Sequence, residues 1–170
     1  MLLLRCTHRV LRLFHQRPRQ AELCAPDAGL GDWYVNYSAR RRQGFLVFVH
    51  ARSLYTLLVD ARLATSIDAL VNRMLERLFL HLDDMVADEK VLAKVANEYR
   101  HVLVTKTADR SVLGSMTDLI NHLRWHADKQ IQEAGHVDLG DIEARLNTIP
   151  QRPIGWSVAV ERFMELCSTL

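Results

Sequence analysis

The sequence contains few of the residues and patterns that identify a specialised class of protein. Its three cysteines, Cys6, Cys24 and Cys167, are far apart and form no CxxC pair or Cys/His cluster, so neither a disulfide framework nor a zinc site is expected. No run approaches the ~18 apolar residues of a membrane-spanning helix. The apolar start ends at Arg5, too early for a signal peptide. We therefore expect a reduced, cytoplasmic protein with no membrane contact.

Motifs that identify common enzymes are also missing. The chain has no GxSxG nucleophile elbow and no glycine-rich phosphate-binding loop, which removes the usual signatures of serine hydrolases and nucleotide hydrolases. His122 and His126 are four residues apart, but the segment HLRWH lacks the glutamate of the HExxH zinc motif. The sequence therefore predicts no metal and no cofactor. It leaves open whether the protein is an enzyme and favours a non-catalytic role.

Length and composition indicate an ordinary globular protein. The 170 residues can bury a core of their own, and we expect one domain over residues 1–170. Hydrophobic residues make up 49% and charged residues 25% of the chain, which is close to average usage. The net charge is only +2, but the first 43 residues are rich in arginine and the remainder is mildly acidic. Such a basic region can meet an anionic partner, although a solvated arginine surface produces the same pattern.

Two kinds of pattern predict strands. The apolar run Met1–Cys6 suits a buried strand. Over Trp33–Ser38 the residue types alternate with a period of two, as expected for a strand with one buried face. Short polar links join the latter to strands over Phe45–His50 and Leu54–Val59, which makes an antiparallel meander. A further strand is expected over His101–Thr107. The segment from residue 17 to residue 32 has no period and is expected to be a loop.

Apolar residues at helical spacing predict several helices. The longest runs from Thr65 through Leu82, and others are expected around Leu92 to Tyr99, from Ser115, over Asp138–Leu146 and from Ser157. Strands followed mostly by helices indicate an α+β fold. We expect an antiparallel sheet, made of the meander plus the N-terminal and the later strand, covered on one face by amphipathic helices.

The stretch KTADRSVLGSMTD contains the leading candidate for a binding site. Lys106 and Arg110 supply positive charge, Ser111 and Ser115 supply hydroxyls, and the amides at a helix N-terminus can receive an anion. The helix is expected to begin at Ser115, because this serine and the Asp118 carboxylate have the form of a capping box. In the alternative interpretation Ser115 only caps the helix and Gly114 only allows a tight turn. Asp118 favours this interpretation, because its carboxylate already neutralises the helix end.

A second candidate is the basic turn Arg40, Arg41 and Arg42, which lies close to Tyr34 and Tyr37. Aromatic side chains beside cations are a common way of holding single-stranded nucleic acid. The same aromatics are also good strand formers, and three arginines suit the solvated tip of a hairpin. Both interpretations remain open.

Several stretches resemble a bacterial family known only as a domain of unknown function. The most specific is RSVLGSM, from Arg110 to Met116, and the others are LLLRCT, GDWYVN and LNTIPQRPIGWSVAVERF. The resemblance covers nearly the whole chain. This sequence has Thr117 where the family usually has Asn, and Val158 where it usually has Pro. The resemblance supports the fold and its boundaries and implies no activity.

The segment from Leu146 to Phe163 is also similar to the tail of some transposase and integrase domains. Those enzymes hold two metal ions with three carboxylates on a ribonuclease-H-like sheet. Asp32, Asp60 and Asp109 are the candidates, and none lies in the middle of the first meander strand. We therefore interpret the similarity as one of local architecture.

These observations favour a small binding or regulatory module that recognises an anionic group or a partner protein at the stretch from Lys106 to Asp118. The alternative is a nucleic-acid-processing enzyme, or a nucleic-acid-binding protein associated with mobile elements. A third class, a protein inhibitor or antitoxin-like partner, also fits the sequence.

Overall fold

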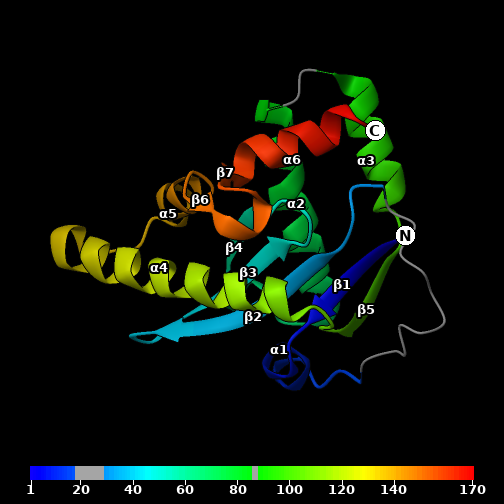
Figure 1. The fold of residues 1–170 in the computed structure, drawn as a ribbon. Helices are drawn as coiled ribbons and strands as arrows, with labels where there is room; N and C mark the ends of the chain where they lie inside the picture. Colours follow the sequence, from blue (N-terminus) through cyan, green and yellow to red (C-terminus); the bar gives the residue numbers. More distant parts are fainter. Residues whose placement is uncertain (18–28, 86–87) are drawn as a thin grey trace.

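The computed structural model describes residues 1–17, 29–85 and 88–170 (Figure 1). Within them, five strands form the main sheet in the order β4-β3-β2-β1-β5, and β6 pairs with β7 in a small second sheet. The strands are β1 (Leu2–Cys6), β2 (Trp33–Arg40), β3 (Gln43–His50), β4 (Thr56–Asp60), β5 (Val102–Lys106), β6 (Pro150–Gln151) and β7 (Ser157–Val158). The α-helices are α1 (His8–Leu13), α2 (Ile67–Met85), α3 (Glu89–Glu98), α4 (Arg110–Ala134), α5 (Leu139–Leu146) and α6 (Ala159–Ser168). Much of the loop expected before residue 32 lies outside the described residues.

The α+β class is confirmed, and so is the antiparallel meander of β2, β3 and β4. The sheet as a whole is mixed, however, because β1 runs parallel to both β2 and β5, with Leu4 opposite Trp33 and Val104. Parallel neighbours need long crossover connections. Here α1 and residues 14–32 separate β1 from β2 along the chain, and α2 and α3 lie between β4 and β5. Among the described strands of the main sheet, the short links that indicate antiparallel pairing occur only inside the meander.

Helices cover both faces of the sheet, and the expectation of one covered face was wrong. Leu46 and Phe48 of β3 belong to a core with α2, α3 and α6, whereas Val47 and Val49 belong to a second core under α4 and α5. In Figure 1, α4 and α5 lie in front of the sheet and α2 lies behind it. Consecutive apolar residues along β3 are typical of a strand that is buried on both sides.

His50, at the end of β3, is a fully buried imidazole that holds the turn between β3 and β4. Its Nε2 lies 3.0 Å from the carbonyl oxygen of Leu30 and therefore donates, while Nδ1 lies 2.9 Å from the Ser53 hydroxyl and accepts. These partners suit the neutral ring. Burial lowers the pKa of His50 from its usual 6.5 to about 3, because the charged ring loses its hydration.

This pKa makes stability depend on pH in a definite direction. The unfolded chain protonates His50 below pH 6.5 and the folded protein does not until about pH 3. The contribution of His50 is therefore complete above pH 6.5 and falls by about 1.4 kcal/mol per pH unit as the pH decreases between these values. We expect His50→Gln, whose amide can donate and accept at the same two places, to flatten this decline in urea unfolding experiments. The exposed His136→Gln should keep the wild-type slope, and an unchanged slope in His50→Gln would contradict the prediction.

Candidate functional site

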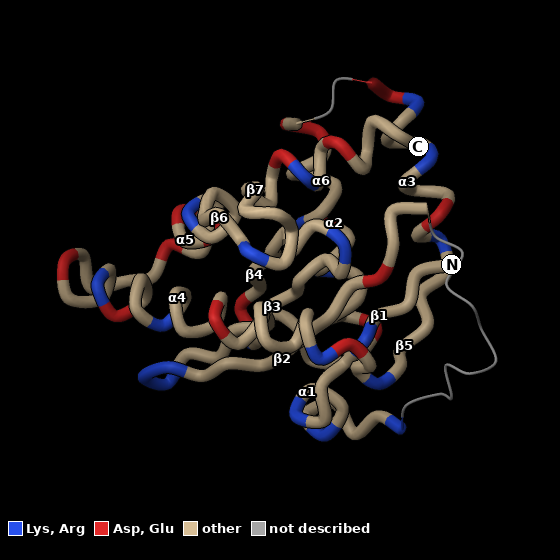
Figure 2. The backbone as a smooth tube through the Cα atoms, viewed as in Figure 1, with Lys and Arg blue, Asp and Glu red and all other residues tan. Residues whose placement is uncertain are grey.

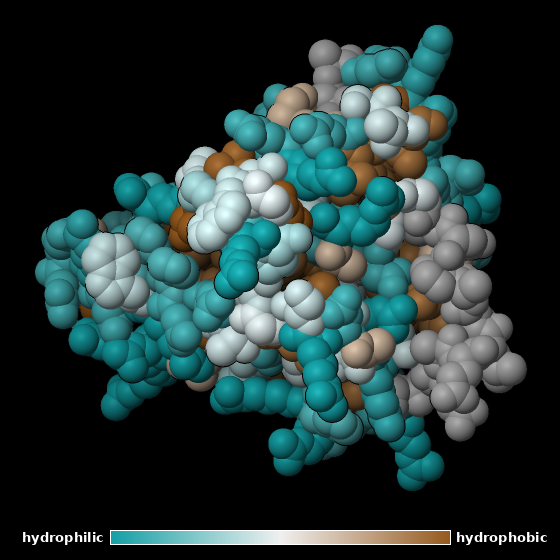
Figure 3. Space-filling view, in the orientation of Figure 1, coloured by the Kyte–Doolittle hydropathy of each residue, from teal (hydrophilic) through white to brown (hydrophobic). Residues whose placement is uncertain are grey.

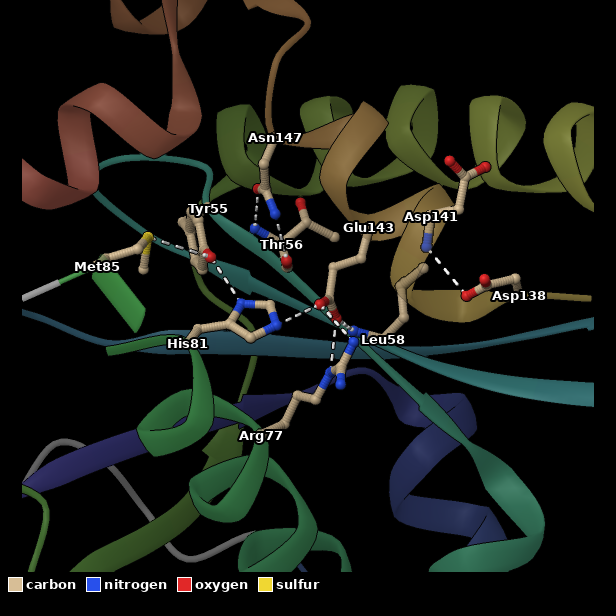
Figure 4. A network of polar contacts seen from close by, with 10 residues as sticks. All are labelled: Tyr55, Thr56, Leu58, Arg77, His81, Met85, Asp138, Asp141, Glu143 and Asn147. Atoms are coloured by element: carbon tan, nitrogen blue, oxygen red, sulfur yellow. Dashed lines mark hydrogen bonds and ion pairs between the residues drawn. The ribbon is translucent and has the colours of Figure 1, made fainter. Parts of the chain in front are cut away.

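The last turns of α5 cover the outer edge of β4, which is an edge strand of the sheet. Asn147 accepts a hydrogen bond from the N–H of Thr56 at 2.7 Å and donates one to the Thr56 carbonyl at 2.8 Å, as a neighbouring strand would. Glu143 accepts from the N–H of Leu58 at 2.6 Å (Figure 4). Four residues of helix rise about 6 Å and two residues of strand rise about 6.6 Å. This match lets one face of α5 bond to alternate residues of β4.

The Glu143 carboxylate is 1% exposed and accepts three further N–H groups from α2. Arg77 Nη2 lies 2.8 Å and His81 Nε2 lies 2.7 Å from Oε1, and Arg77 Nε lies 3.3 Å from Oε2. Arg77 and His81 are four residues apart and therefore share one face of α2. A buried carboxylate without such partners would cost several kcal/mol. This one group consequently joins α2, α5 and β4.

The chain of polar contacts continues from His81 to Tyr55. His81 Nε2 donates to Glu143, and Nδ1 of the same ring shares a hydrogen bond of 2.7 Å with the Tyr55 hydroxyl. Tyr55 stacks on Phe163 of α6 with 4.6 Å between the ring centroids. Burial raises the pKa of Tyr55 above its usual value, so the hydroxyl keeps its proton at neutral pH.

The contacts hold these side chains in fixed orientations but provide little for bond-making chemistry. An oriented histidine beside a hydroxyl is also the core of a catalytic triad, yet the hydroxyl here belongs to a tyrosine that is 3% exposed and has a raised pKa. In the described part of the chain, no group of three or more His, Cys, Asp or Glu side chains could hold a metal ion.

Two adjoining pockets open beside this network, between α2 and α5. One, of about 470 Å³, runs along the end of β4, and the other, of about 460 Å³, lies next to His81. They share Arg77, Leu80 and Gly140, so we call them together the α2–α5 groove. Both volumes lie in the range of known ligand sites. The residues that line the α2–α5 groove are Tyr55, Leu58, Val59, Asp60, Leu63, Arg73, Glu76, Arg77, Leu80, His81, Asp84, Met85, Asp138, Leu139, Gly140, Glu143, Ala144, Asn147, Thr148 and Val160.

The stretch expected to bind an anion lies elsewhere, at the connection from β5 to α4. The helix begins at Arg110 and not at Ser115, because Asp109 is the N-cap and its carboxylate accepts from the N–H of Ser111 at 2.7 Å. Ser115 lies inside the helix and its hydroxyl donates to the Ser111 carbonyl at 3.2 Å. The expected helix start was wrong because two capping sequences follow one another. The N–H of Asp109 donates to the Tyr34 hydroxyl at 3.1 Å, a tertiary contact that anchors the earlier cap.

This start changes what the stretch can offer an anion. Gly114, expected in a tight turn, lies inside α4 with open space around it. The carboxylate of Asp109 already occupies the first amides of the helix, and an incoming anion would be repelled by it. Of the five proposed residues, Lys106, Arg110, Ser111 and Asp118 are exposed and Ser115 is buried. Ser115 and Asp118 line a pocket of about 310 Å³ with residues 149–153. Anion binding at this stretch stays a prediction.

The basic turn lies at the tip of the β2–β3 hairpin. Arg40 Nε lies 2.9 Å from each carboxylate oxygen of Asp128, and Arg41 Nε lies 3.4 Å from Oδ1 of the same group. Asp128 belongs to α4, so two of the three guanidinium groups hold the hairpin against that helix. Nucleic-acid contact at Arg40, Arg41 and Arg42 stays a prediction. The Asp128 carboxylate already balances part of the positive charge that such a contact would require.

The hairpin turn contains two residues in the left-handed region, Arg41 with φ 45° and Arg42 with φ 70°. A residue with a β-carbon pays roughly 1–2 kcal/mol for this conformation, whereas glycine adopts it freely. We expect Arg42→Gly to raise the free energy of unfolding by about 0.5–1 kcal/mol relative to Arg42→Ala, measured by urea denaturation. The alanine variant removes the same charge and keeps the β-carbon. A glycine variant less stable than the alanine variant would show that the turn is not strained.

Glu143→Ala should destabilise the protein by about 3–5 kcal/mol, because it leaves Arg77 charged and partly buried and the Leu58 N–H without its acceptor. Chemical denaturation gives the comparison. The matched control is Glu133→Ala on α4, an exposed residue whose ion pair with Lys129 is 3.9 Å long, and a change within about 0.5 kcal/mol is expected there. If both substitutions lowered the free energy of unfolding equally, the buried network would stabilise the protein no more than an exposed ion pair does.

Sequence reasoning missed Glu143, His81 and Tyr55. One local signal exists, because Glu143 occupies the buried stripe of α5 together with Ile142 and Leu146. An acidic residue at a core position of a helix needs a partner inside the protein. That partner lies on α2, and the sequence around Glu143 does not show which residue it is.

The fold is thus a mixed α+β domain with a buried polar network at one sheet edge and a groove beside it. The family model of the domain of unknown function DUF6933 matches residues 3–162, and the chain belongs to this family. A search of curated proteins found no match. No helix in the described ranges is long and apolar enough to cross a membrane. The similarity to transposase and integrase tails stays a prediction.

Proposed function

We propose that the protein is a binding module that holds an apolar, basic-flanked segment of a partner protein in the α2–α5 groove. The observation that carries the proposal is the exposure of Leu63 and Leu80, each 55% exposed, on the walls of this groove. Apolar side chains that gather at one concavity leave surface that a partner can cover favourably. The hydrogen bonds that Glu143 accepts hold α2 and α5, the two walls of the groove, in place, which reduces the entropy lost when a partner binds.

The segment binds through its side chains and not as an added strand. An extended peptide can lengthen a sheet only where the edge strand has free backbone groups. Along β4 the N–H groups of Thr56 and Leu58 already donate to Asn147 and Glu143. The two pockets of the groove supply places for apolar side chains instead.

The charge around the groove selects the flanks of the segment. Five carboxylates and two guanidinium groups line it, namely Asp60, Glu76, Asp84, Asp138, Glu143, Arg73 and Arg77. Asp60, Glu76 and Glu143 are each paired with an arginine. The remaining carboxylates, Asp84 and Asp138, favour lysine or arginine on either side of the apolar residues. Asp84, near one end, is exposed and is well placed to meet such a flank.

The length of the groove limits the segment. Its α2 wall extends from Arg73 to Met85, which corresponds to about 18 Å of helix. About five residues of extended chain cover that distance.

Fluorescence polarisation with two labelled peptides tests the proposal. Both carry the same leucine-rich core, flanked by lysines in one and by glutamates in the other. We expect the lysine peptide to bind more tightly and to weaken as salt is added. Leu80→Ser should weaken it about fivefold, the effect of losing roughly half of a leucine's burial.

The matched control is Leu13→Ser, which changes an exposed leucine of α1 outside the groove and should leave the affinity unchanged. The proposal fails if both peptides bind equally, or if Leu80→Ser and Leu13→Ser behave alike.

A further inference from the structure

A separate pocket of about 420 Å³ lies between the β3–β4 turn and the chain leading into α6. The turn contributes Arg52, and the chain contributes Pro153, Ile154, Gly155, Ser157 and Arg162. None of these residues lines the α2–α5 groove. In Figure 2, basic positions on the β3–β4 turn, on the loop between β6 and β7 and on α6 lie near one another.

The charge of this pocket is opposite to that of the groove. Two guanidinium groups line it, and no acidic residue is among its described lining residues. Arg52 Nη1 donates to the Gly29 carbonyl at 2.7 Å, which fixes the side chain and leaves its other N–H groups for a ligand. Arg162 Nη1 donates to Glu165 at 2.7 Å in an exposed ion pair. Such a pair contributes little, so an anion in the pocket can compete for the guanidinium.

Ser157 adds a neutral donor to the same pocket. It is partly buried and pairs with Gln151 across the small sheet. A hydroxyl beside two guanidinium groups is a donor set that suits a phosphate with several acceptor oxygens. Figure 3 shows near-neutral and hydrophilic side chains, and no broad hydrophobic area, over the loop between β6 and β7.

Trp156 comes between the lining residues Gly155 and Ser157 in the sequence, although it is not itself one of the residues that line the pocket. It is 67% exposed and has a φ of 63°, so a bulky side chain is held outward in a conformation that is unfavourable for it. The backbone N–H of Trp156 donates to the Gln151 carbonyl at 2.9 Å, which holds the turn. Burial of the ring does not explain its presence here. An exposed indole whose sequence neighbours line a basic pocket can stack on a nucleobase.

We propose that this pocket binds the phosphate of a nucleotide through Arg52, Arg162 and Ser157, with the base stacked on Trp156. The same chemistry is offered by a free mononucleotide and by a phosphate within single-stranded nucleic acid. This site is independent of the proposed binding of a partner segment in the α2–α5 groove.

Titration of the full chain with adenosine 5′-monophosphate, followed by tryptophan fluorescence, tests the proposal. Stacking on Trp156 should produce saturable quenching. Adenosine, which lacks the phosphate, should bind far more weakly, and inorganic phosphate should compete with the nucleotide. A short single-stranded oligoadenylate distinguishes the sources. Tighter binding of the oligomer indicates nucleic acid, and equal or weaker binding indicates a free nucleotide.

Two pairs of variants assign the effect to the pocket. Arg162→Gln should weaken binding about tenfold. Its control is Arg145→Gln on α5, an exposed arginine outside both proposed sites that makes an i,i+4 ion pair with Asp141 at 2.9 Å, and the affinity should not change. Trp156→Leu should abolish the quenching and weaken binding, whereas Trp125→Leu, at another exposed indole, should do neither.

The proposal is overturned if the wild-type protein shows no saturable response to either the mononucleotide or the oligomer. Equal binding of adenosine and its monophosphate would also overturn it, since the arginines would then have no role. The proposal is also overturned if the Arg162→Gln variant keeps both the wild-type affinity for the nucleotide and the wild-type melting temperature. None of these results bears on the peptide experiment, in which the variant is Leu80→Ser.

Discussion

The buried carboxylate of Glu143 is the contact on which the arrangement of β4, α2 and α5 depends. It accepts hydrogen bonds from the backbone of Leu58 and from the side chains of Arg77 and His81. A charge so far from water is stable only while all of these donors stay in place. One group therefore fixes three elements relative to one another, and the groove between α2 and α5 has walls that cannot move independently.

The same contact also closes an edge of the sheet. Exposed edge strands tend to pair with other chains, and β4 has no neighbouring strand on its outer side among the described residues. Asn147 and Glu143 occupy the hydrogen-bonding positions of Thr56 and Leu58. The edge is thus protected by side chains of a helix, and the surface beyond it remains available for contacts of another kind.

The two proposed sites differ in charge and in chemistry but share one helix. The α2–α5 groove is apolar and acidic, and Val160 of α6 contributes to it. The pocket at the β3–β4 turn is basic, and Arg162, two residues further along α6, contributes to that one. Side chains that point in different directions from the first turn of one helix therefore serve both. Phe163 of the same helix stacks on Tyr55, which connects α6 to the polar network as well.

By itself the sequence determined the features that depend on near neighbours. Period-two alternation and short polar links predicted the meander, and helical spacing predicted α2 and α5 close to their observed limits, because these patterns act over a few residues. The start of α4 is also local, yet two capping sequences competed and a contact from Tyr34 decided between them.

Only the tertiary structure decided the parallel pairing of β1, the covering of both sheet faces and the composition of the polar network. Tyr55 and His81 are 26 residues apart, and Arg77 and Glu143 are 66 residues apart. Their meeting depends on how the sheet orders its strands and on which helices pack on each face. Those choices follow from the burial of the whole apolar surface, which no short stretch of sequence contains.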